Sequence, residues 1–471
     1  MLFTEIVFAP FVLLTLVALA MSRGRNGVQL GVLLAASYIF YGWWDVRFLA
    51  LIVFSSALDW AVGAELHGSD SRFRRRLLLT ASLVGNLGLL GFFKYAGFFV
   101  ESLRTGLASL GIEAPLPTLE ILLPVGISFY TFQSLSYTFD IYFGRLEPEP
   151  SLLRFLVYVS AFPQLVAGPI VRARELLPQL RGDFFARSNS AGLLYIFYGL
   201  AKKLYLADIL GANVADRLFR NPGGFGALDT LFALYAYSFQ IFLDFSAYSD
   251  IALGLGLLLG LRLPVNFRSP YGATNPVEFW RRWHITLSSW FRDYLYIPLG
   301  GNRGGDARLA GNLFFVMLVA GLWHGASFTF VLWGAVHGAW LVGYRFWRRW
   351  QGPPRPIGSL RRTVYAVLFF HFVTLAWVLF RAPNLKVAGH VLERLAVWSP
   401  ATTLIEPWPF AALVAAVLVH GLGEPRIEGW SRRFARLSVP LQGLAVYALL
   451  ALLALATQQA ITNRLFIYFQ F

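Results

Sequence analysis

Long apolar segments alternate with short charged ones along the whole chain. A helix needs about 20 mostly apolar residues to cross a bilayer, so this pattern predicts about 11 transmembrane helices and an all-α, polytopic membrane protein. The predicted spans lie near residues 3–21, 28–44, 47–64, 77–100, 121–143, 190–210, 228–260, 309–344, 361–381, 406–423 and 438–457. We expect 309–344 to be a hairpin and 228–260 to break near Asp244 to Asp250. Because no linker or repeat divides the chain, residues 1–471 are predicted to form a single integral-membrane domain.

Composition excludes a soluble enzyme. Hydrophobic residues make up 57% of the 471 positions and charged residues only 14%, against roughly 25% in ordinary soluble proteins. Such a surface requires lipid as its solvent. The net charge of +15 comes from arginine clusters between apolar segments, which is typical of cytoplasmic loops and not of a nucleic-acid-binding surface.

These clusters set the expected orientation. If the basic stretches 23–25, 72–76, 345–362 and 426–436 are cytoplasmic, then both termini and the acidic loop around Glu113 and Glu120 face outward. The segment 152–171 contains Pro163 and Pro169 and cannot be a regular spanning helix. We interpret it as re-entrant from the cytoplasmic side.

The segment 275–298 is too charged to cross lipid. Helical spacing places Arg281, His284, Ser288 and Arg292 on one side of an amphipathic helix at the membrane interface. The tryptophans of this segment favour the interpretation that the helix only anchors the protein at the membrane interface. The alternative is a functional site in which neighbouring arginines keep His284 neutral, and therefore able to accept a proton or a hydrogen bond.

A second candidate is the sequence Gly321-Leu-Trp-His-Gly325, midway along a run without charge between Arg308 and Arg345. The predicted turn carries His324 deep into the membrane, where ionisable residues are costly and usually functional. The alternative is a core histidine bonded to a carbonyl. Glycines on both sides let another chain segment or a ligand approach the ring. His337 is predicted to point elsewhere and to be structural.

The remaining features narrow the chemistry. Polar residues within the predicted spans favour contacts between helices over a proton path: Asp140, Lys202, Lys203, Asp244, Asp250 and His371. No phosphate-binding glycine loop, metal-ligand cluster or serine-hydrolase motif is present, so ATP hydrolysis, metal-dependent hydrolysis and serine-hydrolase chemistry lose support. The chain contains no cysteine, which excludes an acyl-cysteine intermediate.

Six motifs together resemble the membrane-bound O-acyltransferase family, in particular the bacterial branch that contains the alginate O-acetyltransferase membrane subunit. They are Phe162–Ile170, Asp244–Asp250, Phe279–Trp290, Asp293–Asn302, Gly321–Gly325 and Phe466–Phe471. By motif, His324 matches the family's essential histidine and His284 the second polar residue of the site. The residues expected to contact substrate are Arg281, Arg282, Ser288, Arg292 and Trp323.

The resemblance implies a ring of helices around a thin centre, in the inner membrane of a bacterium. It implies transfer of an acetyl group from cytosolic acetyl-coenzyme A to a hydroxyl, with no tightly bound cofactor and no metal. The product would be an O-acetylated, alginate-like polysaccharide outside the membrane, made through a periplasmic partner protein.

Two alternatives stay open at this point. Related enzymes move D-alanine from a carrier protein to teichoic acid. A polysaccharide transporter or flippase is a different class, but it predicts paired inverted repeats, which the sequence does not show. Alginate, cellulose and peptidoglycan all remain acceptable polymers.

Overall fold

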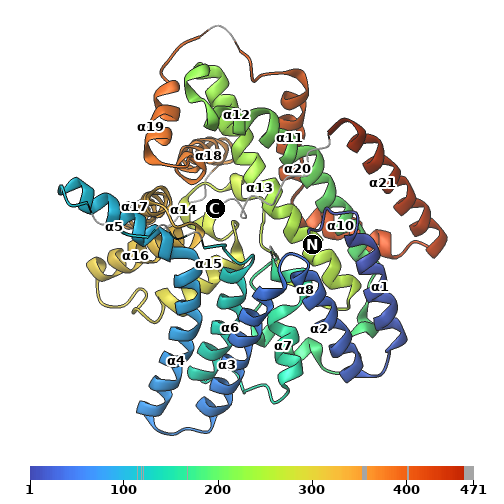
Figure 1. Ribbon diagram of the computed structural model, residues 1–471. Coiled ribbons are helices and arrows are strands. Elements are labelled where there is room, and N and C mark those ends of the chain that lie inside the picture. Colours follow the sequence, from blue (N-terminus) through green and yellow to red (C-terminus); the bar gives the residue numbers. More distant parts are fainter. Residues whose placement is uncertain are drawn as a thin grey trace. The chain divides into compact units, whose positions relative to one another are not determined.

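The computed structural model describes residues 1–113, 115–117, 119, 121–166, 168–352, 358–399 and 402–460, with side chains up to 452. All regular structure in these ranges is helical (Figure 1). Glu120 and the motif Phe466–Phe471 lie outside the described residues.

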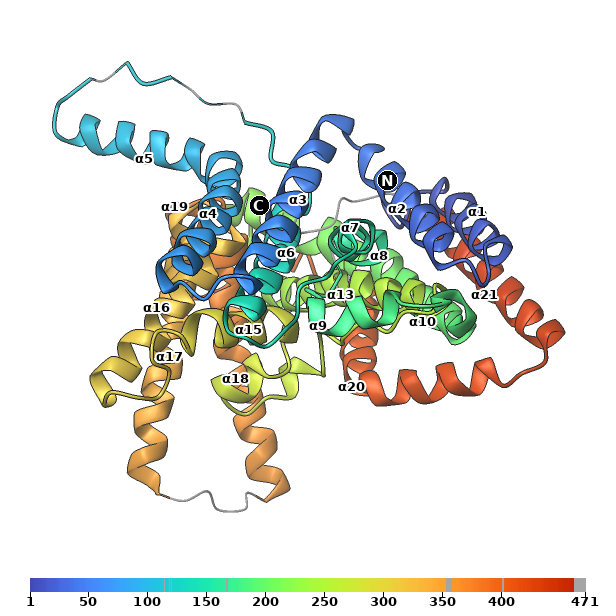
Figure 2. The same ribbon diagram turned by 90° about the horizontal axis from the view of Figure 1, so that it is seen from below.

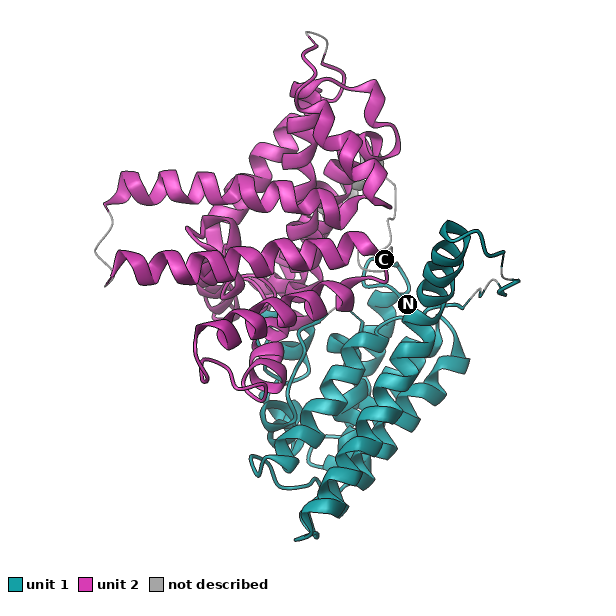
Figure 3. Cartoon of the chain, turned by 90° about the vertical axis from the view of Figure 1, so that its left-hand side faces the viewer, with its two compact units in different colours: residues 1–192, 255–264 teal, residues 193–254, 265–471 magenta. Residues whose placement is uncertain are grey.

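The contacts within the chain divide it into two compact units (Figure 3). Unit 1 comprises Met1–Gly192 and Leu255–Pro264, and unit 2 comprises Leu193–Gly254 and Val265–Phe471. The single domain expected from the sequence stays a prediction.

The helices up to Arg187 belong to unit 1, where η denotes a short 3₁₀ or π helix. They are α1 (Phe8–Met21), α2 (Asn26–Gly42), η1 (Val46–Phe48), α3 (Leu49–His67), α4 (Arg72–Leu90), η2 (Gly91–Tyr95), α5 (Ala96–Ser109), α6 (Ile127–Tyr142), α7 (Leu152–Ser160), α8 (Phe162–Leu165), α9 (Ala173–Leu176), η3 (Leu177–Leu180) and η4 (Phe184–Arg187).

The later helices belong wholly or mainly to unit 2. They are α10 (Ala191–Ala201), η5 (Lys202–Ala207), α11 (Asp208–Leu210), η6 (Gly211–Ala215), α12 (Asp216–Arg220), η7 (Pro222–Gly224), α13 (Ala227–Leu258), η8 (Pro270–Gly272), α14 (Pro276–Trp280), α15 (Ile285–Phe291), η9 (Arg292–Tyr296), α16 (Asp306–His324), α17 (Phe328–Gln351), α18 (Ser359–Arg381), α19 (Leu385–Arg394), α20 (Pro407–Ala435) and α21 (Val439–Ala460).

Six helical segments among the described residues are long and apolar enough to cross a membrane. They are Val46–His67, Arg72–Ser109, Ala227–Leu258, Asp306–His324, Ser359–Arg381 and Pro407–Ala435. Only 17% of the most apolar stretch of Arg72–Ser109 is buried, and the same fraction holds for Pro407–Ala435, so their apolar side chains face outward, where lipid can cover them. Several other predicted spans correspond to shorter helices such as α1, α2 and α6. The protein is therefore a multi-pass helical membrane protein.

In unit 1, α3, α4 and α6 lie side by side around one buried carboxylate (Figure 1). Asp59 on α3 accepts hydrogen bonds from Ser82 and Asn86 on α4 and from Ser134 on α6. In a bilayer a buried polar group needs such partners from neighbouring helices, so this cluster holds the three helices together.

The interruption predicted within 152–171 is confirmed. Helix α7 ends at Ser160, Ala161 has non-helical backbone angles (φ of −51° and ψ of 116°), and α8 is only four residues long. The freed Phe162 N–H donates to Ser37 Oγ on α2 at 3.1 Å, which is how irregular backbone is tolerated inside a membrane protein. Entry of this segment from the cytoplasmic side stays a prediction.

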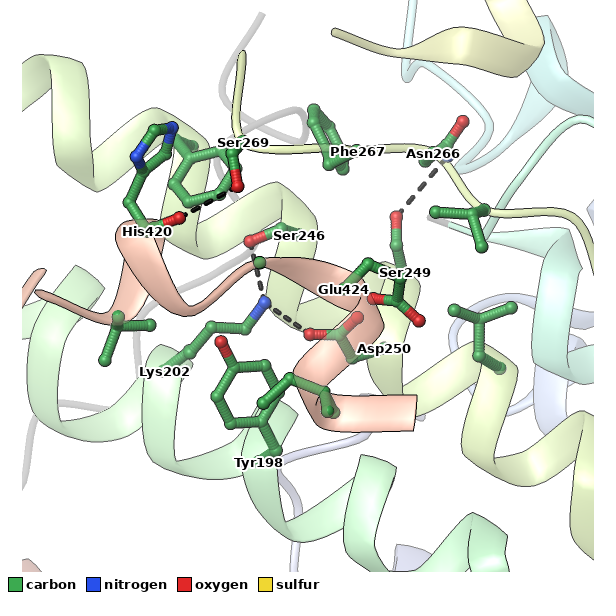
Figure 4. A pocket seen from close by; sticks show the side chains of 16 residues that line it. Tyr198, Lys202, Ser246, Ser249, Asp250, Asn266, Phe267, Ser269, His420 and Glu424 are labelled. Carbon is green, nitrogen blue, oxygen red and sulfur yellow. Dashed lines mark hydrogen bonds and ion pairs between the residues drawn. The ribbon is translucent and has the colours of Figure 1, made fainter. Parts of the chain in front are cut away.

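The predicted break in 228–260 is wrong, because α13 is one continuous helix of 32 residues. Its two aspartates, on which that prediction was based, are neutralised from the neighbouring segment. Lys203 forms an ion pair with Asp244 at 2.8 Å, and Lys202 pairs with Asp250 (Figure 4). With their charges paired, the aspartates do not force the helix to unwind.

For five of the six polar residues of the predicted spans, the contacts confirm that they connect helical segments. The sixth, Asp140, lies 3.8 Å from Arg145, just beyond the end of its own helix. Lys203 contacts Asp208 as well as Asp244, both at 2.8 Å, and Lys202 donates to Ser246 Oγ at 2.8 Å. His371 on α18 hydrogen bonds to Tyr235 on α13 at 2.7 Å.

Helices α16 and α17 form the predicted hairpin, which turns at Gly325 to Ser327. A Cβ added at Gly321 would collide with the Phe330 carbonyl, and one at Gly334 with the Met317 carbonyl. These glycines therefore let the two helices pack closely near the turn. Helix α18 runs beside α17 (Figures 2 and 3), and the three helices form the scaffold that carries His324.

Candidate active site

His324 is the last residue of α16 and is only 3% exposed. Three aromatic rings surround its imidazole, at centroid distances of 5.0 Å for Trp323, 5.2 Å for Trp333 and 5.1 Å for Phe380. They come from α16, α17 and α18, so the hairpin and its neighbour together hold the ring in an aromatic box.

The single amphipathic helix predicted for 275–298 is wrong. Helix α14 ends at Trp280, α15 begins at Ile285, and His284 lies between them with φ of 41° and ψ of 56°. The chain turns here because Trp283 is fully buried against Phe267 at 5.2 Å and Trp377 at 4.9 Å. A regular interfacial helix would leave that indole partly in solvent. As a result, the predicted polar face of four residues does not exist.

His284 is fully buried by this turn. Its ring contacts Phe245 of α13 at 4.7 Å and Trp323 at 6.0 Å. Burial lowers the pKa of His284 to about 3, so the imidazole is neutral at physiological pH. The hypothesis of a functional site also required a neutral His284 ring, but it gave the wrong reason. Desolvation by burial lowers the pKa, and the neighbouring arginines do not. Arg281, one of those arginines, is exposed.

The two predicted histidines meet at Trp323. The indole packs edge-on against both imidazoles, at 6.0 Å from His284 and 5.0 Å from His324. A neutral imidazole accepts a proton or a hydrogen bond through one ring nitrogen. Two imidazoles on one tryptophan, one of them held neutral by burial and both shielded from water, form an arrangement suited to general base chemistry.

Most of the other predicted substrate residues make contacts within the protein. Arg282 pairs with Glu278 at 2.5 Å, and Arg292 pairs with Asp293 at 2.7 Å. Ser288 Oγ donates to the Trp283 carbonyl at 3.2 Å, so it supports the turn at His284. Only Trp323 is brought against the histidines. The role of all five residues in substrate binding stays a prediction.

His337 lies closer to this box than the sequence suggested. Its buried ring packs against Trp333 at 4.6 Å, and Trp333 also contacts His324. A structural role for His337 stays the prediction.

The other aromatic residues around the two histidines were not predicted. Phe245, Trp333 and Phe380 come from three different helices and look like ordinary apolar residues in a sequence rich in them. The one available signal was the position of Phe245 inside the motif Asp244–Asp250.

A pocket in unit 2 holds about 420 Å³, including space open to the outside, and neither His284 nor His324 is among its lining residues (Figure 4). Phe242, Asn266 and Phe267 form part of its wall, and Phe267 also contacts Trp283. Farther along the wall are Tyr198, Lys202, Asp250 and Glu424. The pocket wall therefore includes two residues, Asn266 and Phe267, that contact the turn at His284.

Comparison with known proteins identifies the family. The profile of MBOAT, the membrane-bound O-acyltransferase family, matches residues 145–382, a range that includes both histidines. The chain is 42% identical over 392 residues to the probable alginate O-acetylase AlgI of Pseudomonas aeruginosa, covering 82% of this chain and 72% of the relative. The chain belongs to the membrane-bound O-acyltransferase family. As a member of this family, it is an O-acyltransferase with a polytopic helical fold.

Two other relatives share a lower sequence identity with this chain. The peptidoglycan O-acetyltransferase of Helicobacter pylori is 37% identical over 390 residues, covering 77% of this chain and 72% of the relative. The teichoic acid D-alanyltransferase of Bacillus subtilis is 29% identical over 275 residues, covering 54% of this chain and 68% of the relative.

Proposed function

We propose that the protein moves an acetyl group from cytosolic acetyl-coenzyme A to a hydroxyl, for O-acetylation of a polysaccharide outside the inner membrane. The observation that carries this proposal is the pair of buried imidazoles on Trp323. His324 takes the proton of the acceptor hydroxyl as its oxygen attacks the thioester carbonyl. The carbon–sulfur bond then breaks, and the departing thiolate regains the proton. His284 assists as a neutral hydrogen-bond partner.

Transfer of acetyl is favoured over transfer of D-alanine by the pattern of similarity. The relatives named for alginate and peptidoglycan O-acetylation are 42% and 37% identical over most of this chain, against 29% over half of it for the D-alanyltransferase. We therefore propose an alginate-like polysaccharide as the final acceptor.

A periplasmic partner protein is proposed as the immediate acceptor. His324 is only 3% exposed and enclosed by aromatic rings. A polymer chain is too bulky to reach such a ring, whereas a hydroxyl on a slender side chain can approach it. The partner would then pass the acetyl group to the polysaccharide.

Arg281 is the best candidate for contacting the phosphates of the donor, because it is exposed three residues before His284 while Arg282 and Arg292 have acidic partners. Arg281→Ala is expected to raise KM for acetyl-coenzyme A about 10-fold and change kcat less than 2-fold, as for one lost charge-assisted hydrogen bond. Steady-state kinetics of the purified protein measure both. The matched control is Arg433→Ala, another exposed arginine in unit 2. A fall in kcat at unchanged KM would contradict this role.

We also propose that both termini face the periplasm, with clusters 72–76 and 426–436 in the cytoplasm. Because the chain has no cysteine, single cysteines can be introduced at the exposed positions Glu113, Arg76 and Arg433. On intact cells an impermeant maleimide should label Glu113→Cys, but label Arg76→Cys and Arg433→Cys only after lysis. Labelling of Arg433→Cys from outside would overturn this orientation.

A further inference from the structure

The backbone at His284 is held in a conformation that side chains disfavour. Among the described residues other than glycine, only His284, with φ of 41°, and Ser269, with φ of 45°, have a positive φ. Such a conformation persists only where surrounding contacts impose it. Both residues lie on segments that contact each other: Arg268 N–H donates to the Arg282 carbonyl at 3.0 Å.

Asn266 makes the hydrogen bonds that impose this turn. Its backbone carbonyl accepts from Ile285 N–H at 3.0 Å. Its side-chain Oδ1 accepts from Thr286 N–H at 3.3 Å and from Thr286 Oγ1 at 2.7 Å. The two residues directly after His284 are therefore both fixed to Asn266.

The other end of the Asn266 amide is anchored to the scaffold. Nδ2 donates to Ser249 Oγ on α13 at 3.4 Å (Figure 4). Helix α13 also supplies Phe245, which packs on the His284 ring at 4.7 Å. With an exposed fraction of 1%, Asn266 exchanges none of these bonds with bulk water.

We propose that Asn266 is a positioning residue for acyl transfer, which holds the His284 ring against Trp323 by fixing Ile285 and Thr286. If His284 relaxed to an ordinary helical or extended backbone, the direction of its side chain would change and the ring would leave Trp323. This inference rests on the proposed role of His284 in catalysis. Asn266 itself contacts no reacting atom.

Asn266→Ala keeps the backbone carbonyl but removes the side-chain bonds to Thr286 and Ser249. It is expected to lower kcat about 10-fold to 100-fold, since small misplacements of a catalytic group cost that much, with less than a 2-fold change in KM. Asn266→Asp keeps an oxygen in the place of Oδ1 and should stay within about 5-fold of wild type. Kinetics with purified protein and acetyl-coenzyme A measure both variants.

A double-mutant cycle separates positioning from general support of the fold. If Asn266 acts through His284, Asn266→Ala added to His284→Ala should lower kcat less than about 2-fold further. The matched control is Asn384→Ala, which removes the same amide from the start of α19, where Oδ1 accepts from Val387 N–H at 2.9 Å. That variant should keep kcat within about 2-fold of wild type.

The inference is overturned if the losses from Asn266→Ala and His284→Ala multiply in full, or if Asn266→Ala is no slower than Asn384→Ala. If His284→Ala is itself fully active, the proposed role of His284 fails and this inference with it, whereas the proposed function itself fails only if the wild-type protein transfers no acetyl group. If His284→Ala is impaired and Asn266→Ala is not, only this inference fails. Should the His284→Ala background be too slow to measure, recovery in Asn266→Asp supports the inference and no recovery overturns it.

Discussion

His324→Ala is expected to abolish acetyl transfer while the protein still inserts and accumulates in the membrane. General base catalysis typically contributes 10²-fold to 10⁴-fold, and we expect a loss in that range. Alanine also leaves a space among Trp323, Trp333 and Phe380, so a second variant must keep the packing. His324→Phe retains an aromatic ring without a proton acceptor and should be equally inactive.

Turnover of radiolabelled acetyl by purified variants of matched yield is the measurement. His390→Ala, on the exposed face of α19, provides the matched control and should keep full activity. If either His324 variant kept more than a tenth of the wild-type turnover, the assignment of the base would be wrong.

The α16–α17 hairpin could be predicted from residues that are close together in the sequence. The uncharged run from Arg308 to Arg345 and the glycines around His324 are neighbours in the chain, and they predicted a turn that the structure has at Gly325 to Ser327. The interruption at Ala161 was predictable for the same reason, because proline acts on its own backbone.

Features that depend on distant residues were not predictable. The helical spacing in 275–298 is present in the sequence, but the hydrogen bonds that Thr286 donates to Asn266 and the burial of Trp283 override it. Likewise, α13 stays continuous because Lys202 and Lys203 neutralise aspartates more than 40 positions away in sequence. The aromatic rings around the two histidines come from α13, α16, α17 and α18, and no single segment reveals that they meet.

The side of donor entry is expected to have the second large effect. The phosphates of acetyl-coenzyme A cannot enter the hydrocarbon of the bilayer. The donor therefore has to reach the site from the membrane face on which its proposed phosphate-binding arginines lie. Arg281 and Arg282 lie three and two residues before His284, and Arg292 lies eight residues after it. The basic clusters are proposed to be cytoplasmic. Because the chain has no cysteine, direct transfer needs no acyl-thiol intermediate, and each substrate approaches from its own side.

The most direct test of this account uses sealed membrane vesicles of opposite orientation from cells that produce the protein. Radiolabelled acetyl-coenzyme A is added outside, and label is measured in the periplasmic acceptor fraction of each preparation, with His324→Ala as the background. We predict incorporation in inverted vesicles, where the cytoplasmic face is outside, and at least about 10-fold less in right-side-out vesicles. Equal or greater incorporation in right-side-out vesicles, or a stable acetylated form of this chain without acceptor, would contradict transfer across the membrane by His324.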